Sequence, residues 1–228
     1  MTDREFKEID EYMQKCMSDS AHDKEHIYRV LYTALDIAEH ETNVDMDILI
    51  TACLLHDIGR KEQIDDPKLC HAMVGSQKAY EYLLSIGWDK NKAAIVRDCI
   101  ITHRFRNDRK PETIEAMILF DADKIDVCGA MGIARSLIYR GTVTEPLYTL
   151  NDDGTVCDGT DTNDPSFFRE YHFKLKNLYG RFYTRRGAEM AASRRKAAED
   201  YYNALLSEAR SSYDIGINRL NRWLKCTV

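Results

Sequence analysis

A histidine and an aspartate stand side by side at the end of one strongly apolar segment. Residues 48–55 are almost entirely apolar, and His56-Asp57 follows them directly, before Gly59. This run predicts a buried helix end, where an ionised carboxylate is costly unless it is paired or bound to a metal. The sequence therefore predicts a cation beside His56 and Asp57. Gly59 is expected to let the chain leave the helix in a left-handed conformation.

His26 and Asp121 have comparable surroundings. His26 shares one face of a predicted helix, starting near residues 20–23, with apolar residues three and four positions apart, and Asp121 follows the apolar run 118–120. Asp23 could accept the second ring N–H of His26. Two imidazoles and two carboxylates suit a divalent ion (Mn, Ni, Fe, Co, Mg or Zn) with positions left for water or substrate. We therefore predict a hydrolytic metal site made by His26, His56, Asp57 and Asp121.

The order His, then His-Asp, then Asp resembles the HD superfamily of metal-dependent phosphohydrolases. The likeness is close over residues 21–30, 52–58 and 115–135, and it covers residues 20–140 well. Within it, the segments DADKID (121–126) and GAMGIAR (129–135) resemble a bacterial subgroup that includes small nucleotide pyrophosphohydrolases. The resemblance implies a phosphorylated small molecule, a nucleotide, as substrate, and cleavage of a nucleoside triphosphate to monophosphate and pyrophosphate.

Two further histidines are candidates for the same pocket. His71 opens a segment whose small residues permit close helix packing, and His103 ends a face formed by Ile95 and Cys99. Histidines resembling these line the pocket in HD enzymes, where they contact phosphate or, in some subgroups, bind a second metal. Ordinary structural histidines are the alternative. A basic cluster, Arg104, Arg106, Arg109 and Lys110, follows His103 and could steer a polyanion.

Charged neighbours of the predicted ligands could act on the substrate. Asp121 and Lys124 are three positions apart and share a helix face, whereas Asp123 points elsewhere. Lys124 is therefore expected to contact phosphate or support the ligands, and Asp123 to have a helper role, with Asp126 structural. Arg60 and Lys61 could hold a substrate phosphate or belong to a solvated helix end, and Lys61 is the preferred candidate.

Composition predicts an all-α protein, an HD-type helical bundle with additional C-terminal helices. Only 4 prolines and 11 glycines interrupt the chain, and 44% hydrophobic residues suffice for an ample core. We expect one domain over residues 1–228, with a metal-site core at about 20–140, a polar loop at about 141–165 and helices at about 166–228. A long helix over 189–209 could serve in homodimer contacts.

Net charge and cysteine content indicate which classes of partner and which cellular compartment to expect. The net charge of −6 argues against a general nucleic-acid surface, and no segment predicts a membrane span. Seven cysteines form no Cys-x-x-Cys pair and are expected to be reduced thiols. With the polar start at residues 1–5, these features predict a cytoplasmic protein.

Other functions fit the same ligands. A phosphomonoesterase or cyclic nucleotide phosphodiesterase would use the same metal chemistry on another bond. A non-catalytic HD module would bind a nucleotide without hydrolysing it. A di-iron HD-like oxygenase would need additional ligands, which His71 and His103 could supply; metal content and oxygen consumption would identify it.

Overall fold

The computed structural model describes residues 1–17, 24–104 and 109–225, and it confirms the all-α fold. Within these ranges the secondary structure is helical, and the only pairing outside helices is an isolated bridge between Leu150 and Val156. The chain forms two compact units: Met1–Asp126 with Phe182–Ala188, and Val127–Arg181 with Glu189–Val228. The single HD-type domain expected over residues 1–228 stays a prediction. No helix among the described residues combines the length and apolar character needed to cross a membrane.

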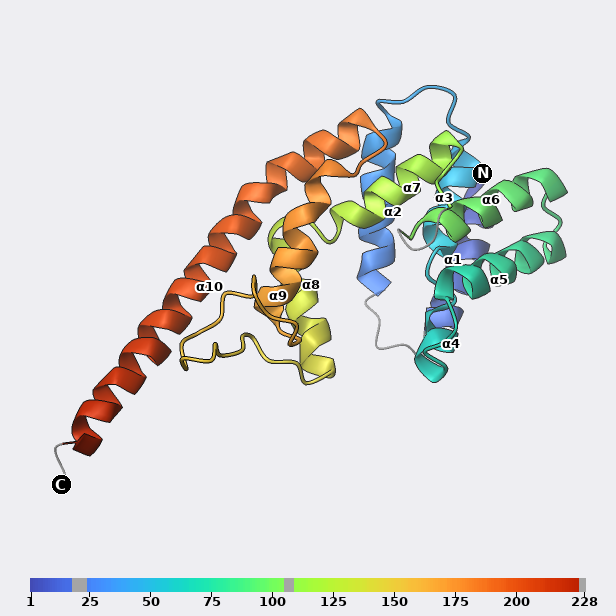
Figure 1. Cartoon of the computed structure of the whole chain (residues 1–228). Coiled ribbons are helices and arrows are strands. Elements are labelled where there is room, and N and C mark those ends of the chain that lie inside the picture. The colour runs from blue at the N-terminus through green and yellow to red at the C-terminus, as the bar shows by residue number, and fades with distance from the viewer. Residues whose placement is uncertain (18–23, 105–108, 226–228) are drawn as a thin grey trace. The chain divides into compact units, whose positions relative to one another are not determined.

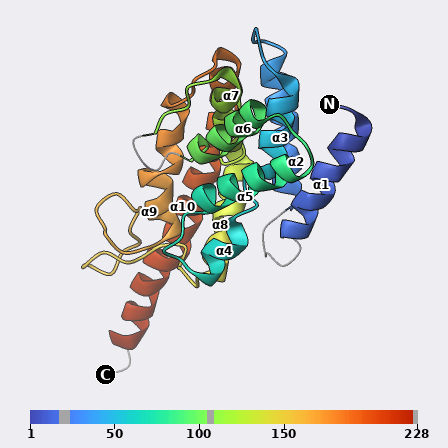
Figure 2. The ribbon, with the colours of Figure 1, turned by 90° about the vertical axis from the view of Figure 1, so that its right-hand side faces the viewer.

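The first unit is a bundle around one buried helix (Figures 1 and 2). Its helices are α1 (Asp3–Met17), α2 (Lys24–Ala38), α3 (Met46–Leu55), α4 (Arg60–Asp65), α5 (His71–Ser85), α6 (Lys90–Thr102) and α7 (Ile114–Ile125). The apolar α3 packs against α1, α2, α5, α6 and α7, which explains why most of its side chains are buried. This burial brings the end of α3 into the interior. The expected start of α2 near residues 20–23, including Asp23, lies outside the described residues.

Side-chain caps define the starts of three of these helices. Asp45 accepts hydrogen bonds from the N–H groups of Asp47 and Ile48, and Asp89 caps α6 in the same way. Thr113 caps α7 by accepting from the Ala116 N–H. Such caps satisfy backbone donors that have no partner inside the helix.

Gly59 is required for close packing, and the left-handed exit expected there is wrong. Its φ is −95°, outside the left-handed region. A Cβ at Gly59 would instead lie 2.3 Å from the His71 carbonyl oxygen and 2.6 Å from the Gly75 backbone nitrogen. The absence of a side chain therefore lets α5 approach the His56-Asp57 turn.

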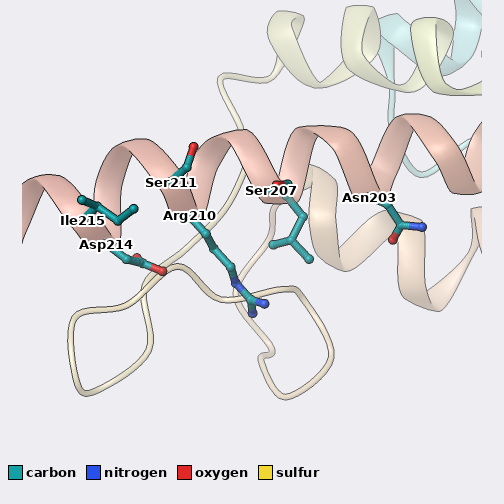
Figure 3. A pocket seen from close by; sticks show the side chains of 7 residues that line it. Asn203, Ser207, Arg210, Ser211, Asp214 and Ile215 are labelled. Carbon is teal, nitrogen blue, oxygen red and sulfur yellow. The ribbon is translucent and has the colours of Figure 1, made fainter.

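The second unit contains α8 (Gly129–Thr142), α9 (Phe167–Phe173), the 3-10 helix η1 (Leu175–Gly180) and most of α10 (Arg185–Lys225). Its core is formed by Ile133, Val156, Phe167, Phe168, Tyr171, Leu175, Ala198 and Tyr202. The segment 144–166 is free of helix, close to the expected loop at 141–165. A shallow pocket on α10 is lined by Ser207, Arg210, Asp214 and neighbouring residues (Figure 3). It contains none of the predicted site residues.

Candidate metal centre

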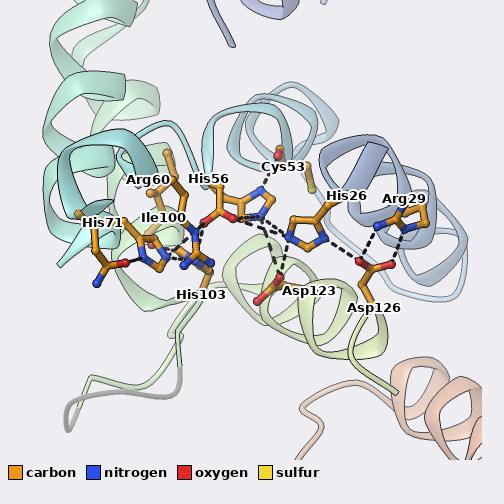
Figure 4. Close-up of polar contacts among 12 residues, drawn as sticks. His26, Arg29, Cys53, His56, Arg60, His71, Ile100, His103, Asp123 and Asp126 are labelled. Atoms are coloured by element: carbon orange, nitrogen blue, oxygen red, sulfur yellow. Dashed lines mark hydrogen bonds and ion pairs between the residues drawn. The ribbon is translucent and has the colours of Figure 1, made fainter. Parts of the chain in front are cut away.

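The predicted His26, His56 and Asp57 come together in the first unit. His26 lies in the first turn of α2, while His56 and Asp57 directly follow α3. All three are buried, with exposed fractions of 4%, 0% and 2%. Helix α7 packs against α2 and α3 and supplies a further carboxylate from Asp123. Figure 4 shows His26, His56 and Asp123 converging from these elements.

These four residues form a compact set of donor atoms. His26 Nε2 lies 3.2 Å from Asp123 Oδ1, 3.4 Å from His56 Nε2 and 3.7 Å from Asp57 Oδ2. His56 Nε2 lies 3.7 Å from Asp57 Oδ2 and 4.0 Å from Asp123 Oδ1. Ligands at about 2.0–2.2 Å from one ion stand about 3 to 3.5 Å from each other. The spacing therefore fits one divalent ion, with small adjustments of the side chains.

A second group of donors meets the other oxygen of Asp57. Asp57 Oδ1 lies 3.2 Å from His71 Nε2 and 3.6 Å from His103 Nε2, and the two histidine nitrogens are 3.4 Å apart. His71 is the first residue of α5, and His103 directly follows α6. The structure thus brings both predicted pocket histidines to the His56-Asp57 turn, and Asp57 places one oxygen in each group.

The outward ring nitrogens show that the inward ones carry lone pairs. Each Nδ1 faces an acceptor at 2.6 to 2.8 Å: Asp126 Oδ2 for His26, the Cys53 carbonyl for His56, Gln63 Oε1 for His71 and the Ile100 carbonyl for His103. An Nδ1 that donates to such an acceptor leaves Nε2 without a proton in the neutral ring. Buried lone pairs of nitrogen and carboxylate oxygen then face each other, an arrangement that a bound cation stabilises. The donor sets therefore fit a metal.

The pKa shifts agree with a site that accepts cations. Burial lowers the pKa of His56 and of His71 to about 4, against the opposing charge of Asp57. Burial acts to raise the pKa of Asp57, but the Arg60 guanidinium and the surrounding histidines outweigh it and hold this pKa well below its usual range. Burial likewise opposes ionisation of Asp123, yet positive charge at His26 and His56, where a bound cation would lie, lowers its pKa. Neutral imidazoles and ionised carboxylates are the forms that bind metals.

Asp121 is not among the donors, which corrects the predicted ligand set. Its carboxylate accepts from the backbone N–H groups of Tyr183 and Thr184, at 2.7 to 3.1 Å, and from the Thr184 hydroxyl at 2.7 Å. Burial raises the pKa of Asp121 despite these bonds. Asp121 therefore anchors the segment Phe182–Ala188 at the start of α10. Asp123, on the other face of α7, takes the position expected for Asp121.

The predicted lysines lie outside both donor groups. Lys124 shares the face of Asp121, as expected, and its Nζ lies 4.1 Å from the centre of the Phe120 ring. Lys61 is exposed on α4, whereas its neighbour Arg60 places Nε 3.0 Å from Asp57 Oδ1. Arg60 is therefore the better candidate for a cation at the site. The expected phosphate contacts of Lys61 and Lys124 stay predictions.

The basic cluster after His103 is only partly described. Arg104 Nη1 contacts Cys70 Sγ at 3.9 Å, and Arg109 and Lys110 are exposed on the segment before α7. Arg106 lies outside the described residues.

Sequence reasoning missed the residues that support the histidines. Asp126 was expected to be structural, yet it contacts His26, and it lies one helical turn after Asp123. Arg29 lies one turn after His26 and contacts Asp126. Spacings of three residues on each helix were the available signal.

Comparison with known proteins agrees with this arrangement. The HD domain family model matches residues 24–128, which include all the donors described above. YpgQ of Bacillus subtilis (strain 168) is 32% identical over 151 residues, covering 64% of this chain and 71% of YpgQ. The chain belongs to the HD superfamily.

Two solved structures of the superfamily resemble the chain over most of its length. YpgQ in complex with ADP has a TM-score of 0.69 at 27% identity, covering 90% of this chain and 95% of YpgQ. A predicted HD superfamily hydrolase from an uncultured Thermotogales bacterium has a TM-score of 0.58 at 28% identity, covering 90% and 91%. Together with the donor groups, these relatives support a metal-dependent hydrolase whose metal is a divalent ion.

Proposed function

We propose that this HD protein is a phosphohydrolase that cleaves a nucleoside triphosphate to a monophosphate and pyrophosphate. A divalent ion would be held by His26, His56, Asp57 and Asp123. The observation that carries this proposal is that the Nε2 atoms of His26 and His56 lie 3.4 Å apart and 3.2 to 4.0 Å from a carboxylate oxygen of Asp57 and of Asp123. A set of two imidazoles and two carboxylates leaves coordination positions for water and substrate.

The bound ion would supply Lewis acidity, lowering the pKa of water and polarising a phosphoryl oxygen. The chain itself would supply positive charge and orientation. Arg60 lies against Asp57 with 26% of its side chain exposed, so its guanidinium is available to a phosphate oxygen. His71 and His103 face the other oxygen of Asp57 and could hold a second ion or contact phosphate. Such groups neutralise charge on the transferred phosphoryl group.

A nucleotide substrate is supported by one comparison and by the subgroup motifs. The related YpgQ has been solved in complex with ADP. The segments 121–126 and 129–135 resemble nucleotide pyrophosphohydrolases. The donor groups alone would serve a monophosphatase or a cyclic phosphodiesterase equally well.

A substrate panel tests the proposal. Chelated protein would be supplied in turn with Mn, Ni, Co or Mg and with nucleoside triphosphates, monophosphates and cyclic nucleotides, and the products would be separated by chromatography. We expect pyrophosphate and a monophosphate from triphosphates, only when metal is present. Inorganic phosphate from monophosphates, with triphosphates untouched, would contradict pyrophosphohydrolysis. Binding without hydrolysis of any compound would indicate a nucleotide-binding module.

A di-iron oxygenase is the second candidate, because His71 and His103 do lie where an additional ion would need them. Asp57 faces both histidine pairs, as a carboxylate shared by two ions would. Iron-loaded protein that consumes oxygen with an organic substrate, and hydrolyses no phosphorylated compound, would favour this function.

A further inference from the structure

Asp126 contacts one of the metal-site histidines and is itself tightly held. Its Oδ2 accepts from His26 Nδ1 at 2.7 Å, and its side chain is only 5% exposed. Arg29 donates from Nε to Asp126 Oδ1 at 2.7 Å and from Nη2 to Oδ2 at 3.1 Å (Figure 4). A two-pronged guanidinium contact of this kind fixes the plane of a carboxylate and compensates its charge in a buried setting.

The other three histidines have neutral acceptors behind them. His56 and His103 donate to backbone carbonyl oxygens within their own helix ends. His71 donates to the amide oxygen of Gln63, whose nitrogen is engaged with the Leu69 carbonyl and so fixes the amide orientation. Among these four contacts, His26 alone is backed by a carboxylate.

We propose that Asp126 is a positioning residue that makes the His26 group the tighter of the two ion positions. The inference rests on the proposed metal centre. A carboxylate behind an imidazole holds the ring in the Nδ1–H form, aims Nε2 inward and increases its ability to donate electrons to a metal. The ion position lined by His26, His56 and Asp123 therefore contains a histidine that donates to a carboxylate. In the other position, His71 and His103 both donate to neutral acceptors. The tightest-bound ion is therefore held by the His26 group.

The same contact ties the end of α7 to α2. His26 and Arg29 lie on α2, while Asp126 directly follows α7, the helix that supplies Asp123. The pair of contacts therefore sets the distance between His26 and Asp123 as well as the ring orientation. Arg29 acts through Asp126 and has no role in the donor set.

Asp126→Asn and Asp126→Ala separate the effect of the negative charge behind His26 from the effect of the hydrogen-bond acceptor. Asparagine keeps a neutral acceptor, as at His71, while alanine removes the acceptor. Gln63→Ala is the matched control, because it removes the acceptor behind a histidine of the other group. Folding would be checked by circular dichroism, and Asp126→Asn, which keeps the shape of the side chain, carries the test if Asp126→Ala does not fold.

Two measurements are made on each variant. Nitrogen-15 NMR of histidine-labelled, metal-free protein reports the tautomer of His26, assigned with a His26→Gln variant. Titration with Mn reports the affinity of the tightest ion. We expect Asp126→Asn to keep the Nδ1–H form with about tenfold weaker Mn binding, and Asp126→Ala to mix tautomers with a loss of up to about 100-fold. Gln63→Ala should leave the tightest ion unaffected.

Folded Asp126 variants with an unchanged tautomer and Mn affinity within about twofold of the natural protein would overturn the proposal. A larger loss of affinity for the tightest Mn ion in Gln63→Ala than in Asp126→Ala would overturn the assignment of that ion to the His26 group. The NMR reading needs neither ion nor substrate. A protein that shows the tautomer change but hydrolyses no phosphorylated compound would therefore contradict the proposed function and support the role of Asp126.

Discussion

Asp123 Oδ1 lies 3.2 Å from His26 Nε2, whereas the carboxylate of Asp121, two residues earlier, binds backbone N–H groups of Tyr183 and Thr184. The two aspartates of one helix thus have different tasks. Asp123 belongs to the donor set, and Asp121 fastens the segment that begins α10.

Substitution of Asp123 should affect metal binding, whereas substitution of Asp121 should affect stability. Asp123→Ala should weaken binding of the tightest Mn ion by at least about tenfold, since a donor is lost. Asp121→Ala should leave Mn affinity nearly unchanged and lower the free energy of unfolding by about 1–3 kcal/mol, because buried backbone donors lose their acceptor. Mn titration and urea denaturation measure the two quantities. Loss of Mn binding in Asp121→Ala alone would restore the assignment made from sequence.

The choice between those aspartates could not be made from local spacing. Periodicity correctly places Asp121 with Lys124 and Asp123 on another face. Which face meets the histidines depends on the segment Phe182–Ala188, about sixty residues further along the chain, which covers Asp121. His26, His56 and Asp57 were predictable because polar groups in apolar runs require a partner.

Arg60 and Lys61 provide a matched pair of neighbouring cations. Arg60→Ala should raise the Michaelis constant for a phosphorylated substrate about tenfold, because the guanidinium nearest Asp57 is lost. Lys61→Ala should change it less than about twofold, since this side chain is exposed and its charge is screened. Steady-state kinetics of the two variants measure both Michaelis constants. Equal effects would show that the exposed surface, rather than the contact at Asp57, attracts the substrate.

The sequence offers both Arg60 and Lys61 as cations one turn from the predicted metal ligands, and Lys61 is the candidate preferred from sequence. The side chain that reaches the site depends on the close approach of α4 and α5 at Gly59 and Gly75. Small residues indicated this packing, but not which of two adjacent cations would face inward.

His103→Ala should affect the second donor group only. We expect the tightest Mn ion to bind within about threefold of its affinity in the natural protein, while hydrolysis falls at least about tenfold. His26→Ala is the comparison, and it should lose Mn affinity as well as rate. Full activity in His103→Ala would return this histidine to a structural role.

The metal-free protein should lose stability on mild acidification. Burial lowers the pKa of His56 and His71 to about 4 from an ordinary 6.5. Between these values the unfolded chain binds protons that the folded protein does not, so the free energy of unfolding falls as the pH falls. Above pH 6.5 both histidines are neutral in the folded and the unfolded chain, so they no longer lower the free energy of unfolding. Urea midpoints at pH 7, 6 and 5 measure it, and a midpoint that does not change would contradict neutral buried imidazoles.

The central claim concerns which side chains hold the ion, and anomalous diffraction from a crystal soaked in Mn tests it directly. We predict a peak within about 2.3 Å of donor atoms from His26, His56, Asp57 and Asp123, with Asp121 still bound to Tyr183 and Thr184. A peak coordinated by Asp121, or the absence of an Mn peak between His26 and His56 in the soaked crystal, would contradict this account.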